Sequence, residues 1–242
     1  MRLRSFGLSD IGLTRAENED VWAALPDIGF FALADGMGGH KGGAVAANEA
    51  IDFLIASISA IEYANSKELI IQVRQAIEKA NRWIYQMSLR STKLSGMGTT
   101  LCCLIWTDDF VAYAHIGDSR VYRLRERKLE LLTQDHSLFT KWLATGKLAQ
   151  QCETPFPYKH VITRALGTGN KVKPEIAIAP HETSDLYFLS SDGLHDVLSL
   201  QEMEDTINQS NSLENSCKNL INLAKFKGSS DNITLVMIQS GK

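Results

Sequence analysis

The chain has 242 residues, of which 44% are hydrophobic and 22% charged, with a formal net charge of −3. This composition supports a sizeable core without disulfides or structural zinc, and the four cysteines form no Cys-x-x-Cys pair. The absence of a long basic run argues against nucleic acid or an acidic membrane as a main partner. With no secretory signal and no apolar stretch near the roughly 20 residues that span a bilayer, we expect one cytoplasmic domain over residues 1–242.

The first part of the chain is predicted to contain a buried strand followed by two long helices. Phe30–Ala34 is an uninterrupted apolar run that ends in Asp-Gly, as a buried strand would. Apolar residues then recur at helical spacing from Ala44 to about Ile61, and again from Leu69 to Met87. Ser66 is the expected cap of the second helix.

The middle of the chain is predicted to form an antiparallel meander, because four apolar runs follow one another with only short polar breaks. These runs are Thr99–Trp106, Phe110–Ile116, Val121–Leu124 and Leu129–Leu132. A helix is expected over His136–Ala144. The irregular stretch 145–160 that follows is typical of a functional flap.

The C-terminal part is predicted to contain a strand, two helices and a final strand. The strands are Leu186–Ser190 and Ile233–Gln239, a capping box at Ser199-x-x-Glu202 starts the first helix, and the second covers Leu213–Phe226. Runs of strands separated by pairs of helices favour an α+β fold, with mostly antiparallel sheets flanked by helix pairs.

Five aspartates stand in short, separate segments, and four of them lie at the end of an apolar run or just before one. They are Asp20, Asp35, Asp118, Asp192 and Asp231. Taken singly, each is better explained as a turn or cap residue. Several carboxylates delivered to one place would repel one another, however, and Mg²⁺ and Mn²⁺ prefer oxygen ligands. Their joint occurrence therefore favours a metal site with more than one ion.

The densest motif is the glycine-rich segment that begins at Asp35. It lacks the Gly-Lys-Ser/Thr of a P-loop and the G-x-G-x-x-G of a dinucleotide loop. The Gly36 carbonyl could approach a metal closely, because glycine has no Cβ, but a flexible turn before a helix explains the motif equally well. Arg15 precedes Asp20 by five residues, and arginine is a natural bidentate partner of phosphate, although a solvated surface charge is the alternative.

Taken together, these segments resemble the metal-dependent protein phosphatases of the 2C type (the PPM family), particularly the compact bacterial form. The resemblance covers essentially the whole chain. The matching segments are Arg15-x-x-Asn18-Glu19-Asp20, Ala34–His40, Gly98-Thr99-Thr100, Ile116–Arg120, Asp135-His136-Ser137, Ile162–Gly167, Ser191–Leu194 and Asp231–Thr234. It implies two central antiparallel β-sheets between helix pairs, with the metals at one end of this sandwich.

The resemblance also implies a centre of two Mn²⁺ or Mg²⁺ ions. Asp35 would bridge the two ions, and the Gly36 carbonyl would bind one of them. Asp192 and Asp231 would complete the centre, and Asp20 would act there partly through bound water. Asp118 matches the position that, together with Asp192, holds a third and weaker metal in bacterial members.

The implied reaction is the one-step hydrolysis of phosphoserine or phosphothreonine by a hydroxide that bridges two metals, without a phosphoenzyme. Arg15 matches the arginine that orients the phosphate. The departing oxygen needs a proton, and histidine suits that role. Human-type members carry a histidine directly after the Asp-Gly, where this chain has Met37. His40 is therefore the candidate donor, and a metal-bound water is the competitor.

The expected partners are phosphorylated proteins and a cognate Ser/Thr kinase, with the phosphatase acting as a monomer. Two alternatives stay open at the level of sequence. One is an inactive family member that acts as a binding module, which should have lost a metal aspartate. The other is a different metal-dependent phosphoesterase, such as a nuclease. His115 and His136 are interpreted as structural, and Cys152 in the flap as incidental rather than redox-sensitive.

Overall fold

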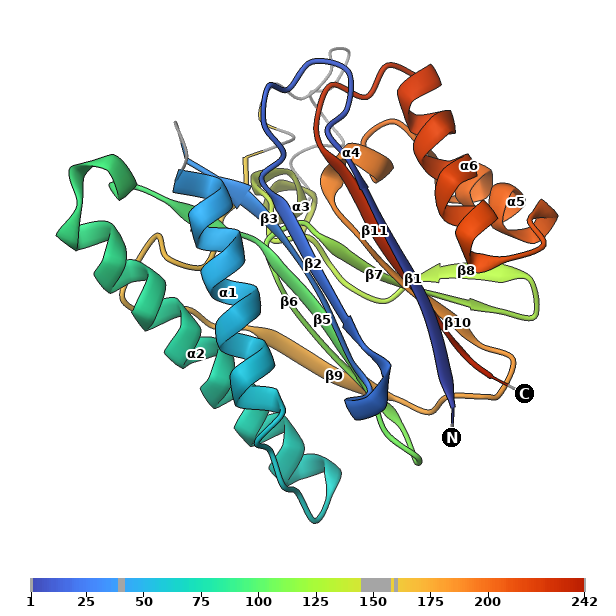
Figure 1. Cartoon of the computed structure of the whole chain (residues 1–242), viewed down its shortest axis with the longest axis horizontal. Helices are drawn as coiled ribbons and strands as arrows, with labels where there is room; N and C mark the ends of the chain where they lie inside the picture. Colours follow the sequence, from blue (N-terminus) through green and yellow to red (C-terminus); the bar gives the residue numbers. More distant parts are fainter. Residues whose placement is uncertain (1, 39–41, 145–157, 159–160, 242) are drawn as a thin grey trace.

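The protein is a four-layer sandwich in which two β-sheets lie face to face and a pair of helices covers each outer side (Figure 1). The computed structural model describes residues 2–38, 42–144, 158 and 161–241. His40, Cys152 and almost all of the predicted flap therefore lie outside the described residues. The predicted α+β sandwich is confirmed, since all strand pairs in both sheets are antiparallel.

The first sheet has five strands in the order β1-β11-β10-β7-β8. Its strands are β1 (Leu3–Asp10), β11 (Ile233–Ser240), β10 (Leu186–Ser190), β7 (Arg120–Arg125) and β8 (Lys128–Leu131). The two central strands, β10 and β11, are almost entirely buried because helices cover one face and the second sheet covers the other. This explains why both strands are continuous apolar runs rather than alternating patterns.

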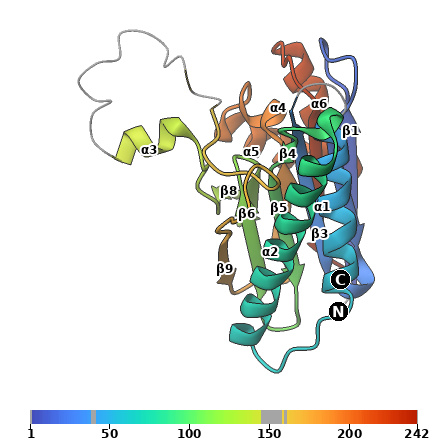
Figure 2. The ribbon, with the colours of Figure 1, turned by 90° about the vertical axis from the view of Figure 1, so that its left-hand side faces the viewer.

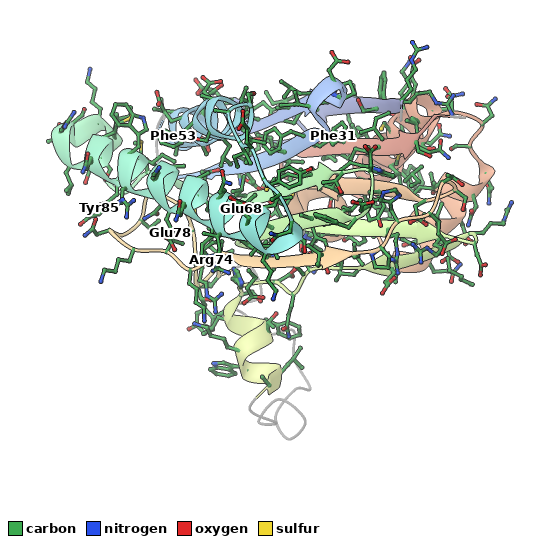
Figure 3. All side chains as sticks on the ribbon, turned by 90° about the horizontal axis from the view of Figure 1, so that it is seen from below. Phe31, Phe53, Glu68, Arg74, Glu78 and Tyr85 are labelled. Atoms are coloured by element: carbon green, nitrogen blue, oxygen red, sulfur yellow. The ribbon has the colours of Figure 1, made fainter. Side chains whose placement is uncertain are left out.

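The second sheet follows the order β2-β3-β5-β6-β9, with the short β4 paired to the end of β3. Its strands are β2 (Asp20–Leu25), β3 (Phe30–Met37), β4 (Gly98–Thr99), β5 (Leu101–Trp106), β6 (Val111–Ile116) and β9 (Glu175–Ala179). Apolar side chains of the two sheets interdigitate between them, and Phe31 of β3 belongs to this inner layer (Figure 3).

Two helix pairs close the outer faces. The helices are α1 (Gly42–Ile58) and α2 (Ser66–Arg90) over the second sheet, and α5 (Leu200–Gln209) and α6 (Leu213–Phe226) over the first. The shorter helices are α3 (Leu138–Ala144), α4 (Asp192–His195), and the 3₁₀ turns η1 (Pro26–Ile28) and η2 (Thr92–Leu94). Figure 2 shows α3 standing out to one side of the sandwich. None of the helices in the described residues is long and apolar enough to cross a bilayer.

Helix boundaries follow the predicted caps with two differences. The capping box of Ser199 and Glu202 is confirmed. The second long helix, however, is capped by Asn65 rather than Ser66, because the Asn65 side chain accepts a hydrogen bond from the backbone N–H of Glu68. The helix expected from His136 begins at Leu138.

The predicted meander over residues 99–132 is wrong at one point. β5 pairs with β6 and β7 pairs with β8, but β6 lies in the second sheet and β7 in the first. The chain changes sheets at Gly117, whose φ of 96° lies in the left-handed region that glycine adopts without strain. This crossing places Asp118 between the two sheets.

Candidate metal centre

The five aspartates come from both sheets and meet at one end of the sandwich. In the β2–β3 pair, Asp20 lies directly opposite Asp35. Asp192 opens α4, two residues after β10, and Asp231 precedes β11, the antiparallel neighbour of β10. Asp118 lies on the crossing turn between β6 and β7. Strands that end at the same edge thus deliver carboxylates from segments more than 200 residues apart.

A cavity of about 440 Å³ opens where these segments meet. It is lined by Arg15, Glu19, Asp35, Gly36, Met37, Gly38, Thr100, Asp118, Ile162, Asp192, Asp231 and Asn232. Asp20 does not line the cavity and is only 8% exposed. The structure thus brings together all the aspartates singled out in the sequence, with four at the cavity and Asp20 buried beside it.

The carboxylates are costly to ionise where they lie. Burial, and then repulsion from Asp20 and Asp192, raise the pKa of Asp35 well above its ordinary value. Burial, and then Asp118 and Asp231, do the same for the pKa of Asp192. Burial is also the main cause that raises the pKa values of Asp20 and Asp118 to about 6. Such clusters of perturbed acids are typical of functional sites.

Two carboxylate oxygens in this cluster are buried without a hydrogen-bond partner among the described residues, namely Oδ1 of Asp20 and Oδ1 of Asp192. Buried polar atoms are rarely left unpaired in proteins, because the lost hydration costs about 1–3 kcal/mol. Acid-rich surroundings with unpaired oxygens fit hard divalent cations, which bind carboxylates, carbonyls and water. The residues present therefore suit the metal centre that the sequence predicted.

Hydroxyl groups fix the other oxygen of Asp20. The Ser191 hydroxyl donates to Asp20 Oδ2 at 2.8 Å, and the backbone N–H of Thr234 donates to Ser191 Oγ at 3.0 Å. These bonds join the start of β2 in one sheet to β10 and β11 in the other. They orient Asp20 so that its second oxygen stays without a protein partner.

A pair of hydroxyls connects the strand of Asp35 to the turn of Asp118. The backbone N–H of Asp35 donates to Thr100 Oγ1 at 2.9 Å, and this hydroxyl lies 2.6 Å from Ser119 Oγ. Both side chains are buried. Asp35 and Asp118 are thus held relative to each other by neutral groups that add no charge to the acidic cluster.

Glycine is the one residue type that position 36 allows. A Cβ at this position would lie 2.4 Å from the carbonyl carbon of Gly43 and 2.8 Å from the carbonyl oxygen of Glu19. Both distances are far below van der Waals contact. Close approach of a metal is thus one reason for a glycine here, and the first turn of α1 is a second.

Arg15 reaches the rim of the cavity from the loop between β1 and β2. Its side chain is 51% exposed, and Nη2 lies 2.6 Å from Asp231 Oδ2. Asn232 holds this loop in place, since its Nδ2 donates to the carbonyl of Ile11 and its Oδ1 accepts from the N–H of Glu19, both at 2.9 Å. Asn232 belongs to the segment Asp231–Thr234 that resembles the family, but this role was not predicted from the sequence.

No histidine lines the cavity among the described residues, and Met37 lines it directly after Asp35 and Gly36. The predicted donor, His40, lies outside the described residues.

Residues 15–226 match the sequence profile of the protein phosphatase 2C family. The chain belongs to this family. The serine/threonine phosphatase Stp of Listeria welshimeri is 34% identical, over 96% of this chain and 93% of that protein. The crystal structure of the Mycobacterium tuberculosis serine/threonine phosphatase PstP/Ppp superposes with a TM-score of 0.89 at 33% identity, covering 99% of each chain.

A second similar structure is the catalytic domain of the serine/threonine protein phosphatase PstP in complex with 2 manganese ions. It has a TM-score of 0.85 and 34% identity, covering 98% of this chain and 97% of that one. This protein phosphatase 2C is therefore a metal-dependent serine/threonine protein phosphatase, and its substrates are phosphoproteins.

Proposed function

We propose that the acidic end of the sandwich is the catalytic metal centre of this phosphatase. Asp35, Asp192 and Asp231 with the Gly36 carbonyl would hold two Mn²⁺ or Mg²⁺ ions, and Asp20 would act partly through water. The observation that carries this assignment is the convergence of buried, mutually repelling carboxylates on one cavity, with two of their oxygens unpaired. The two manganese ions of the similar PstP structure support it.

Asp118 and Asp192 would hold a third ion, as the family resemblance implies. Both line the cavity, Asp118 raises the pKa of Asp192, and both raise the pKa of Asp35. We further propose that the catalytic unit is the single domain of residues 1–242, with residues 145–160 as its flap.

Bound divalent ions would lower the pKa of a water molecule and stabilise negative charge on the phosphoryl oxygens. The aspartates would hold these ions, and Arg15 would bind and orient the phosphate from the rim. Within the described residues no serine, cysteine or histidine lines the cavity, and the Thr100 hydroxyl is already bonded to Asp35 and Ser119. With the aspartates of the cavity occupied as metal ligands, this supports water rather than a side chain as the nucleophile, and hence a single hydrolytic step.

His40 is the proposed donor of the proton to the departing oxygen, with a water as the alternative. Two substrates distinguish these roles, because p-nitrophenolate leaves without protonation whereas a serine alkoxide does not. His40→Ala should lower kcat on a phosphoserine peptide by roughly 100-fold or more and leave kcat on p-nitrophenyl phosphate nearly unchanged. Equal losses on both substrates would count against His40.

The central test measures phosphate release from a phosphothreonine peptide with Mn²⁺, with Mg²⁺ and with EDTA. We expect activity only with a metal, and losses of several orders of magnitude in Asp35→Asn and Asp192→Asn while both variants stay folded. Asp52→Asn, an exposed position on α1, is the matched control. Activity retained in both site variants would refute the metal assignment.

Three further proposals concern the kinase partner, the oligomeric state and the location of the phosphatase. The family resemblance supports the existence of a Ser/Thr kinase that opposes it, a monomeric state and a cytoplasmic location. A phosphoproteome of a deletion strain would identify the opposed kinase through shared substrates. Light scattering on the purified protein and fractionation of cells would test the other two.

A further inference from the structure

The segment Asp135-His136 belongs to one of the motifs that resemble the family, but neither residue has a role in the metal centre proposed above. Both residues bond to the turn that carries Asp118. His136 Nδ1 lies 3.1 Å from the backbone nitrogen of Gly117, and the backbone N–H of His136 donates to the Gly117 carbonyl at 2.8 Å. The Asp135 carboxylate accepts two hydrogen bonds from Arg120, at 2.8 and 2.6 Å. The turn is therefore held on both sides of Asp118.

The hydrogen bonds of His136 determine where its ring carries a proton. Because Nδ1 accepts from the Gly117 N–H, the proton of a neutral ring must be on Nε2. Nε2 lies 3.0 Å from Oε1 of Glu175 on β9, which can accept that proton's hydrogen bond. Arg164 also donates to the same carboxylate oxygen at 2.8 Å. Burial, and then His115, lower the pKa of His136 to about 4, so the ring is neutral.

The same residues could be mistaken for a second metal site, since ligand atoms of His115, His136 and Glu175 lie within 4.8 Å of one another. The hydrogen bonds argue against it. A metal on His136 Nε2 would require an imidazolate ring, because Nδ1 already accepts a bond. Moreover, the positively charged Arg164 guanidinium lies 2.9 Å from Nε2 and would repel a metal ion there.

We propose that His136 is a positioning residue that fixes the Gly117 peptide and thereby aims the Asp118 carboxylate into the metal cavity. Gly117 needs such support, because a glycine in the left-handed region has no side chain to restrict it. Glu175 contributes by keeping the proton on Nε2, just as carboxylates fix the tautomer of metal-bound histidines. The inference rests on the proposed binding of a metal by Asp118.

Two substitutions separate the bond to Gly117 from the bond to Glu175. In His136→Asn the amide oxygen stands near the place of Nδ1 and can still accept from Gly117. In His136→Gln the amide reaches only the place of Nε2, so it can meet Glu175 but leaves the Gly117 N–H unpaired. Both variants lose the ring and its stacking on His115, which makes them matched controls for packing.

The experiment titrates the full chain with Mn²⁺ by calorimetry and measures hydrogen exchange at the Gly117 amide. In His136→Gln we expect the affinity for the third, weaker Mn²⁺ to fall about 10- to 100-fold. The affinities for the two tighter Mn²⁺ ions should stay within about twofold, and the Gly117 amide should exchange faster. In His136→Asn the weak affinity, the tight affinities and the exchange rate should all stay close to those of the wild type. Asp118→Asn should remove the weak event, and adding His136→Gln to it should change nothing further.

Equal behaviour of the two His136 variants, whether both resemble the wild type or both lose all metal binding, overturns the positioning role. Binding of Zn²⁺ that is lost in His115→Ala would overturn it in favour of a second metal site. If instead Asp118→Asn binds Mn²⁺ as the wild type does, the third-metal assignment itself fails, and this inference fails with it. The assignment of the phosphatase activity to Asp35 and Asp192, which is tested with an otherwise wild-type chain, would stand under each of these outcomes.

Discussion

Replacing Asp118 by asparagine should stabilise the metal-free protein even though it removes a proposed metal ligand. Burial, and then Asp135, raise the pKa of Asp118 from 3.8 to about 6. This rise is worth about 3 kcal/mol, because each tenfold change in an equilibrium constant corresponds to about 1.4 kcal/mol. Asparagine keeps the shape without the charge, so it should relieve up to that amount above pH 6. For a chain of this size, about 3 kcal/mol corresponds to roughly 6–12 °C in Tm.

The stability that Asp118→Asn gains should depend on pH in a defined direction. Because the folded pKa lies above the unfolded one, the folded state binds more protons, and the contribution of Asp118 to stability is present below 3.8 and lost as pH rises through about 6. The Tm difference between Asp118→Asn and the wild type should therefore be small at about pH 4 and largest near pH 7.5. Thermal unfolding in EDTA measures it. Excess Mn²⁺ should reduce the difference, since ligands stabilise the state that binds them.

Asp52→Asn on the exposed face of α1 removes the same charge from an exposed position, so its Tm should follow that of the wild type at each pH. A Tm difference for Asp118→Asn that is independent of pH would refute the reasoning. So would a variant that is less stable than the wild type near pH 7.5 in EDTA.

Three further substitutions test other parts of the centre. Gly36→Ala should prevent folding or lower Tm sharply, because its Cβ would lie 2.4 Å from backbone atoms, whereas Gly169→Ala has open space and should be tolerated; equal Tm values would contradict this. Thr100→Val leaves the Asp35 N–H unpaired and should cost about 1–3 kcal/mol in chemical denaturation, while Thr100→Ser, which keeps the hydroxyl, should recover most of it. Arg15→Ala should chiefly raise KM for a phosphopeptide, with Arg15→Lys intermediate; a pure kcat effect would argue against phosphate binding.

The sequence predicted the layers of the fold because burial leaves a strong local pattern. β3, β10 and β11 are continuous apolar runs, and α2 and α6 repeat at 3.6 residues, so their existence could be inferred without any partner. β9 was not predicted, since it is an edge strand that is largely intermediate or exposed and lacks such a run. The cap at Asn65 was misplaced by one residue because Asn and Ser both cap helices well.

The aspartates of the centre could be selected from sequence because they occur together in short segments at or near strand ends, and Asp35, Asp118 and Asp192 each adjoin a glycine. The hydrogen bonds that hold the segments of these aspartates in place could not be predicted. The pairing of Thr100 with Ser119, and of His136 with Gly117, depends on β6 and β7 lying in different sheets. This crossing depends on tertiary packing, which local sequence patterns do not encode. The predicted meander is wrong at the same place for the same reason.

The distribution of the acids over the two sheets has a mechanical consequence. Asp20 and Asp35 belong to one sheet, whereas Asp192 and Asp231 are attached to the strands of the other. Ions shared between them would act as a cross-link that joins the two halves of the sandwich at one end. Sliding of one sheet over the other would then pull the ligands apart, so loss of metal and loosening of the inter-sheet core should be a single cooperative event.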